Sequence, residues 1–217
     1  MTMLKLHGYW RSSAAYRVRI ALNLKGLHYD QAPHDLRANE HHDAAYLALN
    51  PQGLVPALEH DGSVVTQSGA ILEWLEETHP EPPLLPRDAQ SRATVRAMSG
   101  LIACDIHPLN NLRVLRALKT DLHADDMAQK RWAKAWIGEG FAALEQMVAR
   151  HGKGYCFGSE PTLADCYLIP QMFSAQRFEV DLQPYPAIRA VGEHCADHPA
   201  FNRAHPRHQP DADTVNA

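Results

Sequence analysis

The sequence predicts two domains of different class, a small α/β domain followed by an all-helical domain. Up to about residue 79, short apolar runs and helical periodicity alternate in the order strand, helix, strand, helix, strand, strand, helix. After Arg87 the apolar spacing is helical throughout. The stretch PEPPLLP at 80–86 separates the two patterns, because its prolines cannot continue a helix. We therefore expect domains at 1–82 and 83–217.

Local signals define the elements of the first domain. Gly26 suits the left-handed position that follows a helix, and Asn50 with Pro51 closes a short helical piece. Asp61 and Gly62 lie between two apolar runs, which is a strong turn signal and predicts two antiparallel strands. The expected strands cover 3–7, 27–32, 54–58 and 63–65, and the expected helices cover 13–25, 43–50 and 67–79.

The second domain is expected to contain a helix over 91–120 that is kinked near Pro108, since proline removes a backbone donor. A second helix is expected over 127–148. A third begins at Thr162, where Asp165 gives a spacing like that of a capping box, and a last helix covers 188–196. The polar end HPRHQPDADTVNA is expected to fray.

Composition gives no argument for several classes of partner. The 217 residues carry a formal net charge of -4 without a sustained basic stripe, so we expect neither nucleic acid nor a membrane as partner. The first residues lack the features of a signal peptide, and we expect a cytoplasmic protein. The 4 cysteines form no CxxC and the 14 histidines no HExxH, so no metal site is expected.

Two predicted helix starts are candidate anion sites. Ser12 and Ser13 open the first helix, where free backbone N–H groups and the positive end of the helix dipole would stabilise an anion, and Arg11 adds charge. The alternative is an ordinary N-cap, with Arg17 and Arg19 on the solvated surface of the helix.

Gln67 and Ser68 form the second helix start, with the same two interpretations. Two such starts in one small domain favour a ligand with two anionic ends.

Val55 precedes Pro56 at the beginning of a strand. A cis bond there would turn the Val55 backbone outward to pair with an extended, peptide-like ligand, whereas a trans proline at a first strand position is the structural alternative.

Polar residues also gather at the expected kink of the second domain. They either satisfy backbone carbonyls that the kink frees or form a patch that faces a ligand. Arg177 is either a surface charge or a clamp for a carboxylate. The polar residues at the kink are Asp105, His107, Asn110, Asn111 and Arg113.

Five separated motifs give the chain a resemblance to a known family. They are RSSAAYRVRIALNLKG, NPQGLVPAL, QSGAILEWLEE, CDIHPLNNLRVL and TLADCYLIPQ, in order over most of residues 4–200. Together they resemble the zeta class of the glutathione transferase family, and more closely its bacterial maleylacetoacetate and maleylpyruvate isomerases. The resemblance implies a thioredoxin-like N-terminal domain that binds glutathione, an all-helical C-terminal domain that completes the substrate site, and a homodimer.

The resemblance also implies roles for individual residues. Ser12 matches the serine that stabilises the glutathione thiolate, with Ser13 beside it, and Val55 matches the residue before a cis proline, here Pro56, that pairs with the glutathione backbone. Gln67 and Ser68 match the pair that holds the γ-glutamyl end, and His107 and Asn111 match positions where the kinked helix faces glutathione. The residues expected to hold substrate carboxylates are Arg11, Arg113 and Arg177.

One departure from the family narrows the chemistry. The usual signature SSCS reads Ser12, Ser13, Ala14, Ala15 here, so chemistry that needs a cysteine of the protein is not expected. The implied reaction is glutathione-dependent cis-trans isomerisation of maleylacetoacetate to fumarylacetoacetate in aromatic catabolism. Leu112, where maleylpyruvate isomerases can carry arginine, favours this longer substrate. The alternatives are maleylpyruvate isomerisation, general glutathione conjugation and a non-catalytic binding protein of the same fold.

Overall fold

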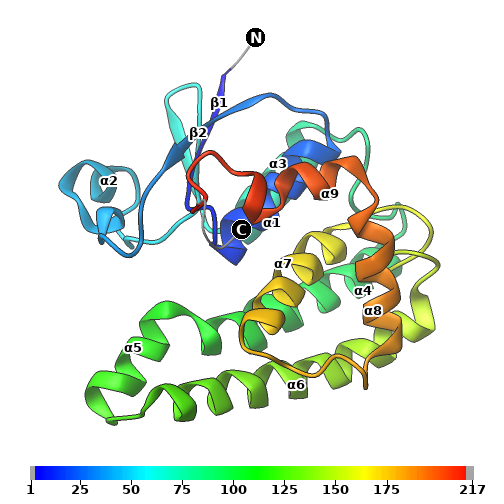
Figure 1. Ribbon diagram of the computed structural model, residues 1–217. Coiled ribbons are helices and arrows are strands. Elements are labelled where there is room, and N and C mark those ends of the chain that lie inside the picture. The colour runs from blue at the N-terminus through cyan, green and yellow to red at the C-terminus, as the bar shows by residue number, and fades with distance from the viewer. Residues whose placement is uncertain (1–2, 214–217) are drawn as a thin grey trace. The chain divides into compact units, whose positions relative to one another are not determined.

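The computed structural model describes residues 3–213, which form two compact units (Figure 1). The first unit contains the described residues up to Leu84 together with those from Ala196 onward, and the second is Leu85–Cys195. The first is an α/β unit and the second is built of helices, as the sequence predicts. The division also lies close to the proline cluster, where no regular element is found between 79 and 88.

A four-stranded mixed sheet forms the centre of the first unit, with strand order β2-β1-β3-β4. β1 is parallel to β2 and antiparallel to β3, and β3 is antiparallel to β4. The strands are β1 (Leu4–Gly8), β2 (Tyr29–Pro33), β3 (Ala57–His60) and β4 (Ser63–Thr66). Asp61 and Gly62 join the last two with positive φ angles of 47° and 75°, the two-residue hairpin turn that an Asp-Gly pair favours.

Helices of the first unit pack through apolar residues that the sequence spaces at three and four. The interior side chains Val18, Ala21 and Leu22 of α1 and Leu72 and Leu75 of α3 have no exposed surface. α1 contacts both α3 and the short α9. The helices of this unit are α1 (Ser13–Leu24), α2 (Ala44–Leu49), α3 (Ser68–Thr78) and α9 (Pro199–Ala204), with 3-10 helices at Glu40–His42 and Pro206–His208.

The second unit is built of helices, and Ile137, Phe141 and Leu144 of α6 are fully buried in it. Thr162 and Asp165 form the expected capping box at the start of α7. No described helix has the length and apolar content needed to cross a membrane. The helices are α4 (Ala89–Gly100), α5 (Leu112–Asp121), α6 (Asp126–His151), α7 (Leu163–Arg177) and α8 (Pro186–Ala196), with a π-helix at Leu101–Ile106 and a 3-10 helix at His107–Asn110.

The interruption expected at Pro108 is longer than the sequence indicates. The α-helix ends at Gly100, continues as the π-helix Leu101–Ile106 and the 3-10 helix His107–Asn110, and resumes at Leu112. A proline has no N–H, and its ring crowds the carbonyl four residues earlier, so its effect extends into the preceding turn.

The expectation that the C-terminal end frays is wrong for the residues the structure describes. Residues 205–213 include the 3-10 helix Pro206–His208, and Gln209 is buried. The Gln209 amide donates to the carbonyls of Arg203 (3.0 Å) and His205 (2.8 Å). Residues 214–217 lie outside the described part of the chain. Because α9 and this end pack on α1, the structure groups them with the first unit, whereas the predicted ranges placed them in 83–217.

Candidate functional site

Three loops meet at one edge of the sheet in the first unit. The register pairs His7 of β1 with Ala57 of β3, and Ala57 with Thr66 of β4. The end of β1, the beginning of β3 and the end of β4 therefore lie side by side. The segments that follow or precede these ends carry Ser12, Val55, and Gln67 with Ser68.

Ser12 is the N-cap of α1. Its Oγ accepts the N–H of Ala15 (3.2 Å), and its own N–H donates to the Tyr9 carbonyl (3.0 Å). The capping interpretation is therefore correct as geometry. It leaves the hydroxyl proton of Ser12 able to donate to an anion, because a serine hydroxyl is both donor and acceptor. Ser13 is buried as the first residue of α1.

Arg17 and Arg19 are not the solvated helix residues that the second interpretation expected; their exposed fractions are 3% and 2%. Arg17 Nη1 donates to the Ser68 Oγ (3.2 Å), which links the start of α3 to α1. Arg19 donates to the carbonyls of Trp10 (2.9 Å) and Ala204 (3.0 Å). Burial lowers the pKa of Arg19 to about 10, so the side chain still carries its charge at neutral pH.

The start of α3 differs from that of α1. The N-cap is Gln67, with a positive φ of 70°, and its side chain makes no capping hydrogen bond. Ser68 is the first helical residue and not the cap that the structural interpretation assumed. The Gln67 amide donates instead to the side chain of Gln52. The first N–H groups of α3 thus lack a cap from this side chain, which is the condition under which a helix start can bind an external carboxylate.

The peptide bond Val55-Pro56 is cis, as the ligand interpretation expected; Glu81-Pro82 is also cis and was not foreseen. Val55 is half-buried and lies outside the ladder between β3 and β4, whose first pair is Ala57 with Thr66. The loop before it is held through the Leu54 carbonyl, which accepts from Tyr46 Oη and Asn50 Nδ2, both at 2.6 Å.

Arg11 lies between β1 and Ser12, in the segment that leads into α1. Its guanidinium is half-buried and lies 5.5 Å from the centre of the Trp10 ring, which is itself buried. A guanidinium over an indole face is held by a cation–π contact while its N–H groups remain directed outward. Arg11 is thus a placed cation one residue before the Ser12 hydroxyl.

The other predicted site residues belong to the second unit. At the kink the structural interpretation finds support, because buried Asn110 donates to the Ile106 carbonyl (3.2 Å) and Asn111 caps α5 by accepting the Arg113 N–H (3.1 Å). The interpretation as a patch that faces a ligand stays a prediction. His107 is half-buried and Arg113 is exposed. Arg177 is the last residue of α7 and is exposed.

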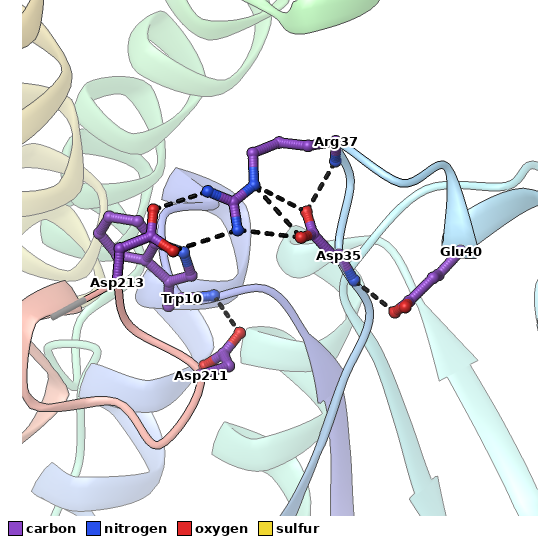
Figure 2. Close-up of polar contacts among 6 residues, drawn as sticks. All are labelled: Trp10, Asp35, Arg37, Glu40, Asp211 and Asp213. Atoms are coloured by element: carbon purple, nitrogen blue, oxygen red, sulfur yellow. Dashed lines mark hydrogen bonds and ion pairs between the residues drawn. The ribbon is translucent and has the colours of Figure 1, made fainter. Parts of the chain in front are cut away.

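The sequence analysis did not identify a group of charged residues beside the loop that precedes Ser12. Asp211 Oδ2 accepts the Trp10 N–H (2.9 Å), and the guanidinium of Arg37 lies between the carboxylates of Asp35 and Asp213 (Figure 2). The contact between Trp10 and Asp211 spans 201 residues of sequence, and no local pattern indicates it.

The cysteines and acidic side chains of the described residues form no second candidate site of cysteine or metal chemistry. Cys156 and Cys195 are buried, and burial raises the pKa of both thiols, which keeps them protonated. Cys166 is buried as well, and Cys104 is exposed in the second unit. Within residues 3–213 no group of three or more His, Cys, Asp or Glu side chains is arranged to hold a metal ion.

Comparisons with known proteins agree with this arrangement. The family model for the glutathione S-transferase N-terminal domain matches residues 2–77, and the model for the C-terminal domain matches residues 126–201. A maleylpyruvate isomerase of Ralstonia sp is 51% identical over 96% of this chain and 100% of its own. A maleylacetoacetate isomerase of Pseudomonas aeruginosa is 50% identical over 96% of this chain and 98% of its own.

Two solved structures extend the similarity to the fold. One, described as the holo structure of maleyl pyruvate isomerase, a bacterial glutathione transferase in the zeta class, has a TM-score of 0.95 at 51% identity and covers 96% of this chain and 100% of its own. The other, a maleylacetoacetate isomerase from Anaeromyxobacter dehalogenans with glutathione bound in the active site, has a TM-score of 0.89 at 47% identity and covers 98% and 99%. The chain therefore belongs to the glutathione S-transferase family and, within it, to the zeta class.

Proposed function

We propose that the protein catalyses the glutathione-dependent cis-trans isomerisation of maleylacetoacetate to fumarylacetoacetate. The observation that carries the proposal is that the segments leading to Ser12 and to the start of α3 leave the same end of the sheet, in a chain 50% identical to a maleylacetoacetate isomerase. Ser12 supplies a donor for a thiolate, and the start of α3 supplies N–H groups for a carboxylate.

Residues of the first unit would bind glutathione at both of its ends. The start of α3, with Gln67 and Ser68, would hold the γ-glutamyl carboxylate, since the N-cap side chain leaves the helix N–H groups to an external acceptor. Val55, just outside the ladder, would pair with the peptide backbone of glutathione. Ser12 would then meet the thiol of the same molecule.

Isomerisation requires rotation about a double bond. Even the partial double bond of a peptide has a rotation barrier of ~20 kcal/mol, and a full C=C bond is stiffer. Glutathione supplies a thiolate that adds reversibly to the conjugated alkene, so that rotation occurs about a single bond. An ordinary thiol with a pKa of ~8.5 is mostly protonated at neutral pH. The role of Ser12 and the start of α1 is therefore to stabilise the anion.

Arginines would bind the substrate. Arg11, held over Trp10, is placed to neutralise a substrate carboxylate or the charge that develops on the diketone. We assign the same role to Arg113 and Arg177 of the second unit, both of which are exposed and therefore accessible to a diacid. His107 and Asn111 at the kink are assigned to glutathione on the strength of the family resemblance.

Assembly, compartment and pathway are part of the proposal. We propose a cytoplasmic homodimer that acts in the catabolism of tyrosine through homogentisate, on the strength of the resemblance to the isomerase branch of the family. A sedimentation measurement at several protein concentrations tests the dimer, with a single species of monomer mass as the contrary result.

The experiment that tests the function is an isomerase assay of the purified protein with maleylacetoacetate and, separately, maleylpyruvate, each with and without glutathione. Maleylpyruvate is the second candidate because a maleylpyruvate isomerase is 51% identical to this chain. We expect glutathione-dependent turnover and a higher kcat/KM for maleylacetoacetate. A higher kcat/KM for maleylpyruvate would reverse the substrate assignment. Greater activity in conjugating a chloro-dinitro aromatic compound would favour a general transferase.

A further inference from the structure

The peptide group between Tyr9 and Trp10, just before Ser12, is held on both sides. Its N–H donates to Asp211 Oδ2 at 2.9 Å. Its carbonyl accepts the Ser12 N–H at 3.0 Å and faces Arg19 Nη1 at 3.5 Å. Rotation of this peptide would break the bond that forms the turn into Ser12, so its orientation and the placement of Ser12 are coupled.

Arg19 connects the same segment to the C-terminal part of the chain. Its Nη2 donates to the Trp10 carbonyl at 2.9 Å, while its Nε donates to the carbonyl of Ala204, the last residue of α9, at 3.0 Å. The side chain is 2% exposed, so water does not replace these partners readily. One buried guanidinium thus ties the loop before Ser12 to the end of α9.

Further contacts fasten the C-terminal segment 199–213 to the first unit. Asn23 of α1 donates to the Ala200 carbonyl (3.0 Å), and Gln31 of β2 donates to Gln209 Oε1 (3.1 Å). Beyond Asp211, the Arg37 guanidinium binds Asp213 on one side and Asp35 on the other (Figure 2). The segment is therefore anchored before and after the residue that reaches Trp10.

We propose that the C-terminal segment 199–213 holds Ser12 in position, with Arg19 and Asp211 as positioning residues that act through the backbone of residues 9–12. The inference rests on the proposed role of Ser12 at the glutathione thiolate. A reacting group must be held within about 0.5 Å of its productive geometry. A loop that precedes a helix does not fix a side chain to this precision by itself. A peptide group whose N–H and carbonyl are both hydrogen-bonded does.

Positioning and charge predict opposite effects at Asp211. If the carboxylate acted only through its charge, removing it would favour the thiolate, because a nearby negative charge disfavours a second one. If Asp211 positions Ser12, its loss weakens the hydrogen bond from Ser12 and disfavours the thiolate. Asp211→Ala separates the two, and Asp211→Asn, which keeps an oxygen acceptor for the Trp10 N–H but no charge, is the conservative variant.

The experiment is a pH titration of the ultraviolet absorbance of the thiolate in the holoenzyme with glutathione, together with kcat and the KM for glutathione. For Asp211→Ala we expect a raised apparent pKa of the bound thiol, kcat lowered by about three- to tenfold, and little change in KM. Asp211→Asn should retain most of the wild-type behaviour. Asp213→Ala, which loosens the segment at an exposed ion pair, should give a smaller effect of the same sign.

Asp88→Asn is the matched control, since Asp88 also accepts a backbone N–H, that of Ser91 at 2.8 Å, but at the start of α4. It should titrate as wild type. In a Ser12→Ala background, Asp211→Ala should have no further effect on the bound thiol, because its action passes through Ser12.

Three results would overturn the inference: a lowered apparent pKa in Asp211→Ala, wild-type titrations in folded Asp211→Ala and Asp213→Ala, or additive effects of Ser12→Ala and Asp211→Ala. A Ser12→Ala variant that titrates as wild type would instead refute the proposed role of Ser12 itself, and this inference with it.

Discussion

Arginines near the candidate site residues of the first unit and the candidate arginines of the second unit are held in different ways. In the first unit Arg17 and Arg19 are buried, and each bonds a fixed partner at or before a helix start. In the second unit Arg113 and Arg177 are exposed at helix ends. The Arg177 guanidinium lies 5.7 Å from the centre of the Phe178 ring. Buried contacts favour one geometry, whereas an exposed side chain keeps more rotamer freedom. Under the proposed function, this contrast predicts that the residues assigned to glutathione are held in place before the ligand binds, and that Arg113 and Arg177 are ordered further when the diacid binds.

The first test of this contrast is Arg19→Met, for which we expect the largest effect, a loss of stability. The substitution leaves the buried carbonyls of Trp10 and Ala204 without their donor, and each unsatisfied group costs about 1–3 kcal/mol. The free energy of unfolding should fall by about 3 kcal/mol or more, measured by urea unfolding. Arg189→Met, which removes a 39% exposed arginine, is the control and should change it by about 0.5 kcal/mol or less. Equal losses in both variants would contradict the contrast.

The second test is Ser12→Ala. We expect turnover to fall by about 100-fold, since the variant removes a donor aimed at the reacting anion. Loss of the N-cap should cost about 1 kcal/mol of stability, so folding and catalysis are affected to different extents. The KM for glutathione should change little. Ser63→Ala, at an exposed serine of β4, should retain full turnover, and the assignment of Ser12 fails if the two variants behave alike.

Substitution of Arg177 or Arg11 by Met tests the arginines assigned to the substrate, one exposed in the second unit and one held over Trp10 in the first. We expect each to raise the KM for the maleyl substrate about tenfold, because a bidentate pair with a carboxylate is lost. The stability of Arg177→Met should stay within about 0.5 kcal/mol of wild type. Arg150→Met, at an exposed position of α6, serves as the control for kinetics. A loss of stability at unchanged KM would show that these arginines are structural.

The smallest expected effect concerns pH and the C-terminal segment. Burial lowers the pKa of His205 to about 4, and the cations Arg207 and Arg19 act in the same direction. In the unfolded chain the imidazole has a pKa of ~6.5. Between these values the unfolded chain binds more protons, so the free energy of unfolding falls as the pH is lowered from ~6.5 towards 4. His205→Gln should reduce that slope in urea unfolding between about pH 7 and about pH 5. An unchanged slope would contradict the burial of His205 in solution.

Much of the fold is predictable from local pattern. The change from strand to helix periodicity, the Asp61 and Gly62 turn, and the proline cluster each act over a few residues, and the structure has the corresponding hairpin and division into units. The prediction for Arg17 and Arg19 was wrong because a charged residue in a helix is usually exposed. The sequence does not show that α1 packs against both α3 and α9. The C-terminal segment was misjudged because its polar side chains bond the protein instead of water.

The candidate site is less predictable than the fold. Periodicity identified the helix starts at Ser12 and Ser68, but their meeting follows from strand register, which pairs Ala57 with both His7 and Thr66. The sequence suggested one ligand with two anionic ends for these helix starts, but not the register that brings them to the same end of the sheet. The contact from Asp211 to Trp10 depends on the path of the whole chain, and neither residue has a neighbour in sequence that signals it.

The central claim is that the protein uses the thiol of glutathione and not one of its own. The most direct measurement is maleylacetoacetate isomerisation with glutathione and with S-methylglutathione, which has the same carboxylates and backbone but no free thiol. We predict turnover with glutathione, none above the uncatalysed rate with S-methylglutathione alone, and competitive inhibition by S-methylglutathione when both are present. Turnover with S-methylglutathione alone would contradict the account.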